Sequence, residues 1–401
     1  MLNKMKIVQI EDFFHPDAGY QINILSKYMA KNGHQVTIIT ASLDKLDGGV
    51  VKFFGKNNIQ ERDRAYSKRY NVKIVRIPVK RIISGRAVFG RQLISAIKKE
   101  MPDIVYAHGN DTLSGMQYLC KYNRLGYPLI MDSHMLEMAS VNRFNRLYRK
   151  LYKKIFTPII IKNKIQVIRT QNDPYVEKCL GIPLSQAPWI SVGSDTMLFH
   201  PDNNARKEFR KKHAIAENDF VVLYAGKLDE SKGGMLLAEV IKEKLDCTKN
   251  VTICIVGKTL DEYGEKVEET FRISENRILR FPTQKYEDLA IFYQAADLAV
   301  FPRQCSLSFY DVQACGLPVL FEENSVNIGR AQRGNALTFK VDDVKGFREG
   351  LVKMIDMNAD EFKAMGESAT RYVEENFDYK DIATAYLDLI NCEMIRQKRS
   401  K

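Results

Sequence analysis

The sequence predicts an α/β protein with two domains, each built around a parallel β-sheet. Short runs of β-branched residues alternate with stretches of helical pattern, and this alternation is typical of repeated βαβ units. The alternation stops at the polar segment that begins at His200-Pro201 and then starts again. The chain has 401 residues, which is long enough for two domains. We therefore expect two Rossmann-like domains at residues 1–200 and 201–383, and a C-terminal helix at about 384–401 that packs back on the first domain.

Each expected strand is a short apolar run. In the first domain these runs lie at residues 6–10, 35–40, 72–77, 103–106 and 127–131, and in the second at 221–224, 252–256, 278–281 and 298–301. Residues 41–70 are polar and contain several glycines, which predicts a long loop or hairpin. The last 40 residues show one continuous helical pattern.

Composition narrows the class of protein. Hydrophobic residues make up 45% of the chain and charged residues 27%, which is ordinary for a globular protein. The seven cysteines include no Cys-x-x-Cys pair and do not group with histidines, so neither a disulfide framework nor a zinc site is indicated, and a reducing cytosol fits best. The N-terminus has no signal-peptide core, and no apolar run approaches the roughly 18 residues that span a bilayer. We expect a soluble or peripheral cytoplasmic protein.

The positive charge belongs to the first domain. Residues 1–200 hold 31 Lys and Arg against 15 Asp and Glu, whereas the remainder holds 30 against 34. Residues 138–172 contain no acidic residue and nine basic ones. Six of these lie within twelve positions, and they are Arg143, Arg146, Arg149, Lys150, Lys153 and Lys154.

These basic residues lie on a predicted amphipathic helix. Its apolar residues recur at helical spacing and are Phe144, Leu147, Leu151 and Ile155. Such a helix can lie on an anionic membrane or acceptor, with Tyr148, Tyr152 and Phe156 near the headgroups. The alternative is a helix packed on its own domain with a solvated basic face, because packed surface helices are also amphipathic. No helix-turn-helix, zinc-finger or ribonucleoprotein motif occurs, so no nucleic-acid partner is expected.

The segment Gly226-Lys-Leu-Asp-Glu-Ser-Lys-Gly233 resembles a phosphate-binding loop. It follows an apolar strand pattern and precedes a helical one, so backbone N–H groups and the two lysines, Lys227 and Lys232, can surround one diphosphate. The alternative is a solvated loop with two surface lysines. A sugar nucleotide carries such a diphosphate.

Five landmarks in order resemble the retaining glycosyltransferases of family 4, which have the GT-B fold, two Rossmann-like domains whose parallel sheets face each other across a cleft. The landmarks cover nearly the whole chain. They are His15-Pro-Asp-Ala-Gly-Tyr with Gly33-His-Gln-Val, Pro102-Asp-Ile-Val-Tyr-Ala-His108, Val192-Gly-Ser-Asp195 through Pro201, the loop 226–233, and Asp311-Val-Gln-Ala-Cys-Gly316-Leu-Pro-Val.

The resemblance implies roles for individual residues. Lys227 and Lys232 would stabilise the departing diphosphate and, with His134 at the sugar-transfer site, form the catalytic set. Asp311, which stands where the family has Glu, would bind the donor ribose. The other donor-binding residues implied are Gly19, Gly233, Ser306, Leu307 and Ser308, with Ser306 as a cap for a short helix.

The most important departure from the family replaces an acid with a cation. Eight residues before Asp311, where the family has its first Glu, this chain has Arg303. Gln304, Ser306 or Ser308 could supply neutral hydrogen bonds to the sugar instead, or Arg303 could contact a phosphate or an acidic sugar. A third option is that the site binds a nucleotide and no longer transfers.

The resemblance implies a retaining hexosyltransferase that uses a nucleoside diphosphate sugar as co-substrate, with no cofactor and no metal. The expected acceptor is a lipid-linked or cell-surface glycan at the inner face of the cell membrane, where the protein would be peripheral. Two alternatives remain. They are a non-catalytic GT-B glycan-binding or partner subunit, supported by Arg303, and a sugar-nucleotide epimerase.

Overall fold

The computed structural model describes residues 4–44, 49–138, 144–259, 261–303 and 306–399, and the chain divides into two compact units. Unit 1 is Met1–Val192 with Tyr379–Lys401, and unit 2 is Gly193–Asp378. The chain therefore passes between the units a few residues before each boundary that the sequence suggested.

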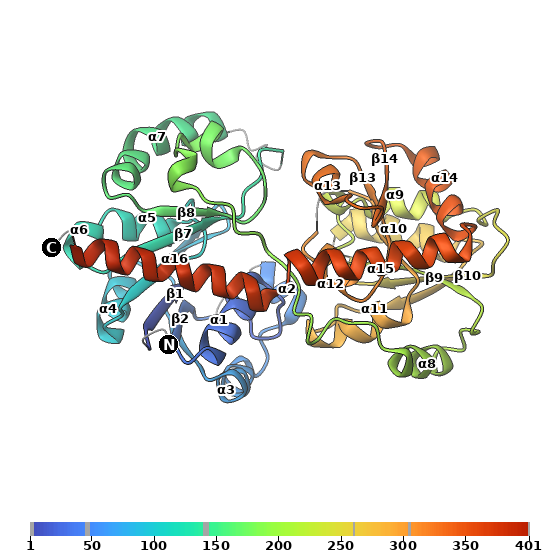
Figure 1. The fold of residues 1–401 in the computed structure, drawn as a ribbon, viewed down its shortest axis with the longest axis horizontal. Helices are drawn as coiled ribbons and strands as arrows, with labels where there is room; N and C mark the ends of the chain where they lie inside the picture. Colours follow the sequence, from blue (N-terminus) through green and yellow to red (C-terminus); the bar gives the residue numbers. More distant parts are fainter. Residues whose placement is uncertain (1–3, 45–48, 139–143, 260, 304–305, 400–401) are drawn as a thin grey trace. The chain divides into compact units, whose positions relative to one another are not determined.

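Unit 1 contains a six-stranded parallel sheet in the order β3-β2-β1-β6-β7-β8 (Figure 1). Its strands are β1 Lys6–Ile10, β2 Gln35–Ala41, β3 Val72–Ile77, β6 Ile104–Ala107, β7 Leu129–Ser133 and β8 Gln166–Arg169. A separate antiparallel hairpin consists of β4 Arg81–Ile83 and β5 Arg86–Val88. The helices are α1 Gln21–Lys31, α2 Gly49–Phe54, α3 Ile59–Tyr70, α4 Arg91–Glu100, α5 Leu113–Leu119, α6 Tyr122–Leu125, α7 Asn145–Lys162 and the long C-terminal α16 Tyr379–Arg399.

Unit 2 repeats this architecture with the strand order β11-β10-β9-β12-β13-β14. Its strands are β9 Phe220–Ala225, β10 Val251–Val256, β11 Arg277–Phe281, β12 Leu298–Phe301, β13 Val319–Glu322 and β14 Ala336–Phe339. Its helices are α8 Asn203–Lys212, α9 Gly234–Val240, α10 Asp261–Arg272, α11 Ala290–Ala295, α12 Ser308–Ala314, α13 Ser325–Arg330, α14 Val344–Ile355 and α15 Ala359–Asn376. The expected α/β class with two parallel sheets is confirmed.

The central strands of each sheet are buried because both faces of the sheet are covered there. All six residues of β9 are buried, and β1 is buried from Ile7 to Ile10. Such continuous apolar runs are characteristic of parallel sheets, in contrast to the alternating pattern of a half-exposed antiparallel sheet. The apolar runs that mark the strands in the sequence are therefore the cores of the two units.

Two expectations about local structure are wrong. Residues 41–70 are not a long loop, because α2 and α3 lie there; α3 is polar, but Ile59 and Tyr66, seven positions apart, are buried on one face. The C-terminal helical pattern is also interrupted, since α15 ends at Asn376 and α16 begins at Tyr379. At the break the Phe377 carbonyl accepts a hydrogen bond from the Ser194 amide at 2.9 Å.

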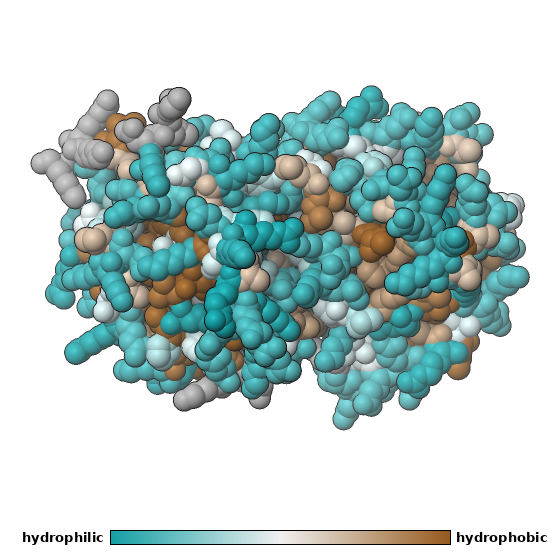
Figure 2. All heavy atoms as spheres, turned by 90° about the horizontal axis from the view of Figure 1, so that it is seen from below, coloured by the Kyte–Doolittle hydropathy of each residue, from teal (hydrophilic) through white to brown (hydrophobic). Residues whose placement is uncertain are grey.

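Hydrophilic residues cover most of the face shown in Figure 2, and the hydrophobic residues visible there form separate patches. Among the described helices, none combines the length and the apolar content that crossing a bilayer requires.

Candidate active site

Each sheet has one place where its strand order reverses. In unit 2 this place lies between β9 and β12, and in unit 1 between β1 and β6. Ligands of open α/β sheets bind beyond the carboxyl ends of the strands at this switch point. Gly226 and Lys227 follow β9, Arg303 lies two residues after β12, and His108 follows β6. The topology thus gathers several of the sequence-predicted residues at the switch point of their own unit.

The loop from Gly226 to Gly233 is shaped by an aspartate. Asp229 accepts hydrogen bonds through Oδ1 from the Lys232 amide at 3.0 Å and from Ser231 Oγ at 2.6 Å, and so caps the short 3₁₀ turn Glu230–Lys232. Lys227 is exposed and Lys232 is half-buried. The loop passes directly into α9, whose N-terminal amides lie at the same edge of the sheet.

Gly233 brings this loop against the end of β12. Its φ is +74°, and a Cβ added there would lie 2.9 Å from Pro302 Cβ and 3.2 Å from Arg303 Cβ. Only glycine fits both the backbone conformation and this close approach. The two loops of the switch point are therefore packed together at a position where the sequence predicted donor binding.

Arg303, the residue that replaces the family's first Glu, is held within unit 2. Its guanidinium donates to the Glu230 carbonyl at 3.2 Å and forms an ion pair with Asp342. The hydrogen bond to Asp342 and the charge of that carboxylate raise the pKa of Arg303 above its ordinary value, so the guanidinium stays cationic. Arg303 thus lies beside the lysine loop, while Gln304 lies outside the described residues.

Asp311 is buried on α12 and is hydrogen-bonded. Its Oδ1 accepts from Ser194 Oγ at 2.8 Å and from the Tyr286 hydroxyl at 3.2 Å. Burial raises the pKa of Asp311 to about 8, against the opposing effect of these two donors. A carboxyl group in this state is both a donor and an acceptor near neutral pH, which suits the hydroxyl groups of a ribose.

The serines before α12 are arranged differently from a simple cap. The helix begins at Ser308 with Leu307 as its N-cap residue, and Ser306 Oγ accepts from the Ser308 amide at 3.3 Å. The Ser306 carbonyl accepts a hydrogen bond from Arg330 at 2.7 Å. Ser306 therefore caps the first turn from one position before the N-cap.

In unit 1, His134 belongs to a buried polar network centred on Asp132. The fully buried Asp132 Oδ2 lies 3.2 Å from His134 Nε2 and 3.1 Å from His108 Nδ1, and accepts from the Tyr106 hydroxyl at 2.5 Å. Its Oδ1 accepts from the Gly109 amide at 2.6 Å. Burial opposes the charge on Asp132, but the two imidazoles outweigh it and lower the pKa of this carboxyl group below its ordinary value.

Two imidazoles and a carboxylate are also a set that can bind a metal ion, and their ligand atoms lie within 4.8 Å of one another. Both oxygens of Asp132 already accept hydrogen bonds from Tyr106 and the Gly109 amide, and His108 Nε2 lies 2.8 Å from Gln9 Oε1. These contacts fit a proton-bearing network better than a metal centre.

Sequence reasoning missed Asp132, Tyr106 and the role of His108. The available signal was the position of each residue near the carboxyl end of β6 or β7, which are neighbours in the sheet. Gly19 lies in the loop between β1 and α1, as expected. Gln21, at the start of α1, is buried and donates to the Tyr386 hydroxyl of α16 at 2.6 Å.

The apolar stripe of α7 faces solvent. Phe144, just before the helix, is 68% exposed, and Leu147, Leu151 and Ile155 are 58%, 47% and 46% exposed. The helix does pack on its own domain with a solvated basic face, as the alternative expected, but these four residues take no part in that packing.

The aromatic face of α7 points the other way. Tyr152 is fully buried, and Tyr148 and Phe156 pack against the core of unit 1. The expectation that these three rings lie near lipid headgroups is wrong, because they supply the packing that holds the helix on the unit.

The basic residues of α7 differ in their surroundings. Arg146, Lys150 and Lys154 are exposed along one row at i, i+4 and i+8, beside the apolar stripe. Arg149 is half-buried with its guanidinium 5.7 Å from the Tyr175 ring centroid, and Lys153 donates to the Lys178 carbonyl at 3.0 Å. Arg143 lies outside the described residues.

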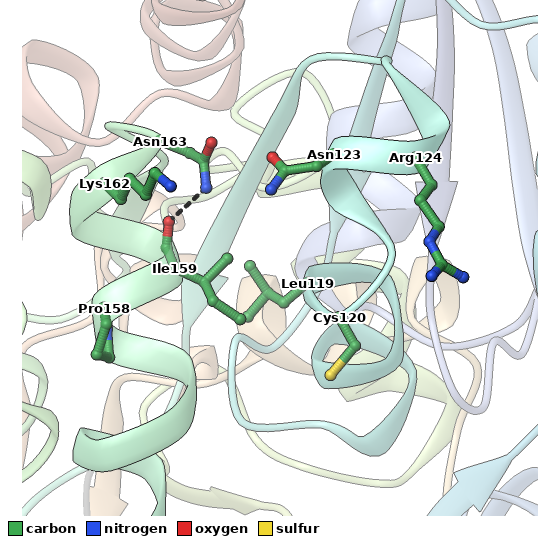
Figure 3. A pocket seen from close by; sticks show the side chains of 8 residues that line it. All are labelled: Leu119, Cys120, Asn123, Arg124, Pro158, Ile159, Lys162 and Asn163. Atoms are coloured by element: carbon green, nitrogen blue, oxygen red, sulfur yellow. Dashed lines mark hydrogen bonds between the residues drawn. The ribbon is translucent and has the colours of Figure 1, made fainter.

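A cavity of about 350 Å³ lies at the C-terminal end of α7 (Figure 3). Leu119 and Ile159 face each other across it, and Pro158 and Lys162 of α7 contribute to its wall. Pro158 and Lys162 continue the spacing of the exposed stripe, three and seven residues beyond Ile155. The exposed surface of α7 therefore extends to this cavity.

Two family models match the chain. The model described as Glycosyl transferases group 1 matches residues 205–372, and the model described as Glycosyltransferase Family 4 matches residues 18–162. The first covers most of unit 2 and the second most of the N-terminal part of unit 1.

One curated relative is a lipopolysaccharide 1,2-N-acetylglucosaminetransferase of Salmonella typhimurium. It is 25% identical over 165 residues, which are 38% of this chain and 40% of that protein. The match thus spans well under half the length of the relative.

Solved structures match over nearly the whole chain. A glycosyltransferase from Rickettsia africae is 16% identical with a TM-score of 0.74, over 98% of this chain and 99% of its own. The Anabaena protein Alr3699/HepE in complex with UDP and glucose is 15% identical with a TM-score of 0.75, over 97% of this chain and 100% of its own. At these identities the likeness concerns the fold.

Proposed function

Because the chain belongs to the group 1 glycosyltransferases of family 4, which have the GT-B fold, we propose that it transfers a hexose from a nucleoside diphosphate sugar to a glycan. The observation that carries this proposal is the lysine loop of unit 2. Lys227, Lys232 and Gly233 lie at the switch point, beside the cationic Arg303. This arrangement suits a diphosphate that gains negative charge as the sugar departs.

In this proposal, the reaction proceeds with retention of the anomeric configuration and without a metal ion. Retention rests on the resemblance of the landmark segments. Independence of metal rests on the cations of the loop, because lysine ammonium groups and helix N-terminal amides can neutralise a diphosphate. Asp311, hydrogen-bonded to Ser194 and Tyr286, is the residue we assign to the ribose hydroxyls.

The acceptor in this proposal is a lipid-linked or cell-surface glycan, reached at the inner membrane face. The support is the exposed stripe of Leu147, Leu151 and Ile155 beside the row of Arg146, Lys150 and Lys154. An amphipathic helix of this composition lies in the interface of an anionic bilayer, with its apolar side chains among the lipids. The name of the Salmonella relative refers to lipopolysaccharide.

Donor binding is tested by thermal stabilisation with a panel of nucleoside diphosphates and their sugars in EDTA, starting with UDP. Binding to the folded state raises the melting temperature. We expect one base to stabilise the wild type, and Lys232→Ala to remove the effect. Lys242→Ala, at an exposed lysine just after α9, is the matched control and should keep it. No response to any nucleotide would favour the non-catalytic alternative, and a requirement for Mg²⁺ would contradict independence of metal.

Transfer and its stereochemistry are then measured with the stabilising sugar nucleotide and membrane lipid extracts. The anomeric configuration of the product bond, determined by NMR, should equal that of the donor. An inverted product would contradict the retaining assignment while leaving the donor site intact.

Membrane binding is tested by co-sedimentation with vesicles. Leu151→Ser with Ile155→Ser, and separately Lys150→Glu with Lys154→Glu, should each weaken binding to anionic vesicles. The control is Arg64→Glu with Lys68→Glu, which makes the same charge change at i, i+4 on the exposed face of α3. Equal binding by all three variants would refute the membrane role of α7.

A further inference from the structure

The carboxylate of Asp132 is held in place by residues from several elements of unit 1. It is fully buried, and it takes hydrogen bonds from Tyr106 on β6 and from the Gly109 amide just after β6. His108 Nδ1 lies 3.1 Å from the same carboxylate, and the other nitrogen of that ring lies 2.8 Å from Gln9 Oε1 on β1. A buried carboxylate is retained only when donors compensate for its loss of hydration. Asp132 has these donors and is therefore fixed in position.

The C-terminal helix α16 covers the network around Asp132 from another side. The Tyr386 ring of α16 lies 5.8 Å from the Tyr106 ring, and its hydroxyl accepts from Gln21 at 2.6 Å. Tyr106 and Tyr386 are both fully buried. The return of the chain from unit 2 thus covers the network with aromatic rings and keeps the Asp132 carboxylate away from water.

His134 is the one partly exposed member of the network, with 42% of its side chain accessible. Its Nε2 points inward to Asp132 at 3.2 Å, and its Nδ1 lies 3.3 Å from Thr170 Oγ1. Thr170 donates its single hydroxyl proton to the Ser133 carbonyl at 2.9 Å, so toward His134 it can only accept. Both ring nitrogens of His134 therefore face acceptors, which is the environment of an imidazolium.

We propose that Asp132 is a positioning residue that holds His134 doubly protonated, so that the exposed edge of the ring presents an N–H donor and a positive charge to an oxygen of the substrate. The proposal rests on the proposed function, which places His134 at the sugar-transfer site. The weak contact to Thr170 is the one that a substrate hydroxyl or phosphate oxygen replaces. Asp132 touches no substrate and acts through His134.

The charges around His134 support this state. Burial acts to lower the pKa of His134, but Asp132 on β7, Glu11 after β1 and Asp111 before α5 outweigh it and raise the pKa above its ordinary value. The second imidazole that faces the same carboxylate is that of His108, just after β6. Removing the charge of Asp132 takes away the largest of the opposing effects, so the pKa of His134 should fall.

The first test measures the imidazole pKa of His134 by NMR in ligand-free protein, with the signal assigned by its loss in His134→Gln. We expect a wild-type pKa above the ordinary 6.5 and a fall of about one unit or more in Asp132→Asn, because the neutral amide supplies no charge. A wild-type pKa at or below 6.5, or an unchanged pKa in Asp132→Asn, would overturn the proposal. This readout needs no turnover, so it stands apart from a failure of the proposed function.

A second variant guards against a folding defect in Asp132→Asn. Tyr106→Phe keeps the Asp132 carboxylate and removes one of its hydrogen-bond donors. The pKa of His134 should therefore stay above its ordinary value in this variant. Tyr118→Phe is the control, because Tyr118 is equally buried and its hydroxyl makes only a long 3.5 Å contact to the Tyr127 carbonyl. If Tyr106→Phe lowers the pKa of His134 as far as Asp132→Asn does, the carboxylate is not the controlling group and the proposal fails.

Activity adds a readout that a purely structural role would not move. Once transfer is measured, the alkaline limb of the kcat profile should shift to lower pH in Asp132→Asn, in step with the pKa of His134. A uniform loss of kcat at every pH, with the limb unmoved, would contradict the proposal.

Discussion

Gly233→Ala tests whether the lysine loop must lie against the end of β12. Alanine at a φ of +74° costs about 1–2 kcal/mol, because the left-handed region crowds its Cβ. The new Cβ would also lie 2.9 Å from Pro302 Cβ, and Pro302 cannot move aside as a flexible side chain would. Such overpacking costs about 1–3 kcal/mol more. We therefore expect a loss of about 2–5 kcal/mol in the free energy of unfolding of unit 2.

Gly334→Ala separates the two contributions. Gly334 has nearly the same φ, +73°, but a Cβ there would meet nothing within 4 Å, so only the backbone cost of about 1–2 kcal/mol applies. The assay is urea unfolding, with thermal stabilisation by the preferred nucleotide measured on both variants. Nucleotide stabilisation should disappear in Gly233→Ala and persist in Gly334→Ala. Equal unfolding midpoints and equal nucleotide responses would refute the packing argument.

The other predictions concern two ionisable residues of unit 2, Asp311 and Arg303. Because the pKa of Asp311 is about 8 when folded, against 3.8 for an exposed carboxyl group, the folded state binds more protons between these values, and the unfolding free energy should fall as pH rises through this window. In Asp311→Asn, the unfolding free energy should depend less steeply on pH in unfolding curves measured from pH 4 to 8. If the pH dependence is unchanged, other groups cause it and the prediction for Asp311 is wrong. Arg303→Ala should weaken nucleotide binding more than Asp342→Ala does, if Arg303 contacts a phosphate. Because Asp342 is largely exposed, loss of the ion pair itself should cost at most about 1 kcal/mol of stability. Equal losses of nucleotide affinity in the two variants would show that Arg303 acts only through its ion pair with Asp342 and contacts no phosphate.

Strand positions followed from local pattern. The expected strands at residues 72–77 and 298–301 match β3 and β12 to the residue, because β-branched or aromatic residues recur in both segments. The pattern was insufficient at α3, where only Ile59 and Tyr66 are buried and the polar majority resembles a loop. A helix held by few contacts leaves a weak periodic signal.

The lysine loop was proposed from its place between a strand pattern and a helical pattern, and Asp311 from the resemblance of residues 311–319 to a family motif. The orientation of α7 did not follow from the sequence. An amphipathic pattern reports two kinds of face and does not say which one is buried. The structure packs Tyr152 into the core and leaves Leu151 and Ile155 in solvent.

The sequence by itself determined the two parallel sheets, the glycine-bounded lysine loop and the basic character of the first domain, because each depends on residues close together in the chain. Only the tertiary structure decided how β6, β7 and α16 bring His108, Asp132 and Tyr386 to one place, since these residues are separated by up to 278 positions. Buried polar networks form where strands and helices meet, and a linear pattern carries no record of which ends meet.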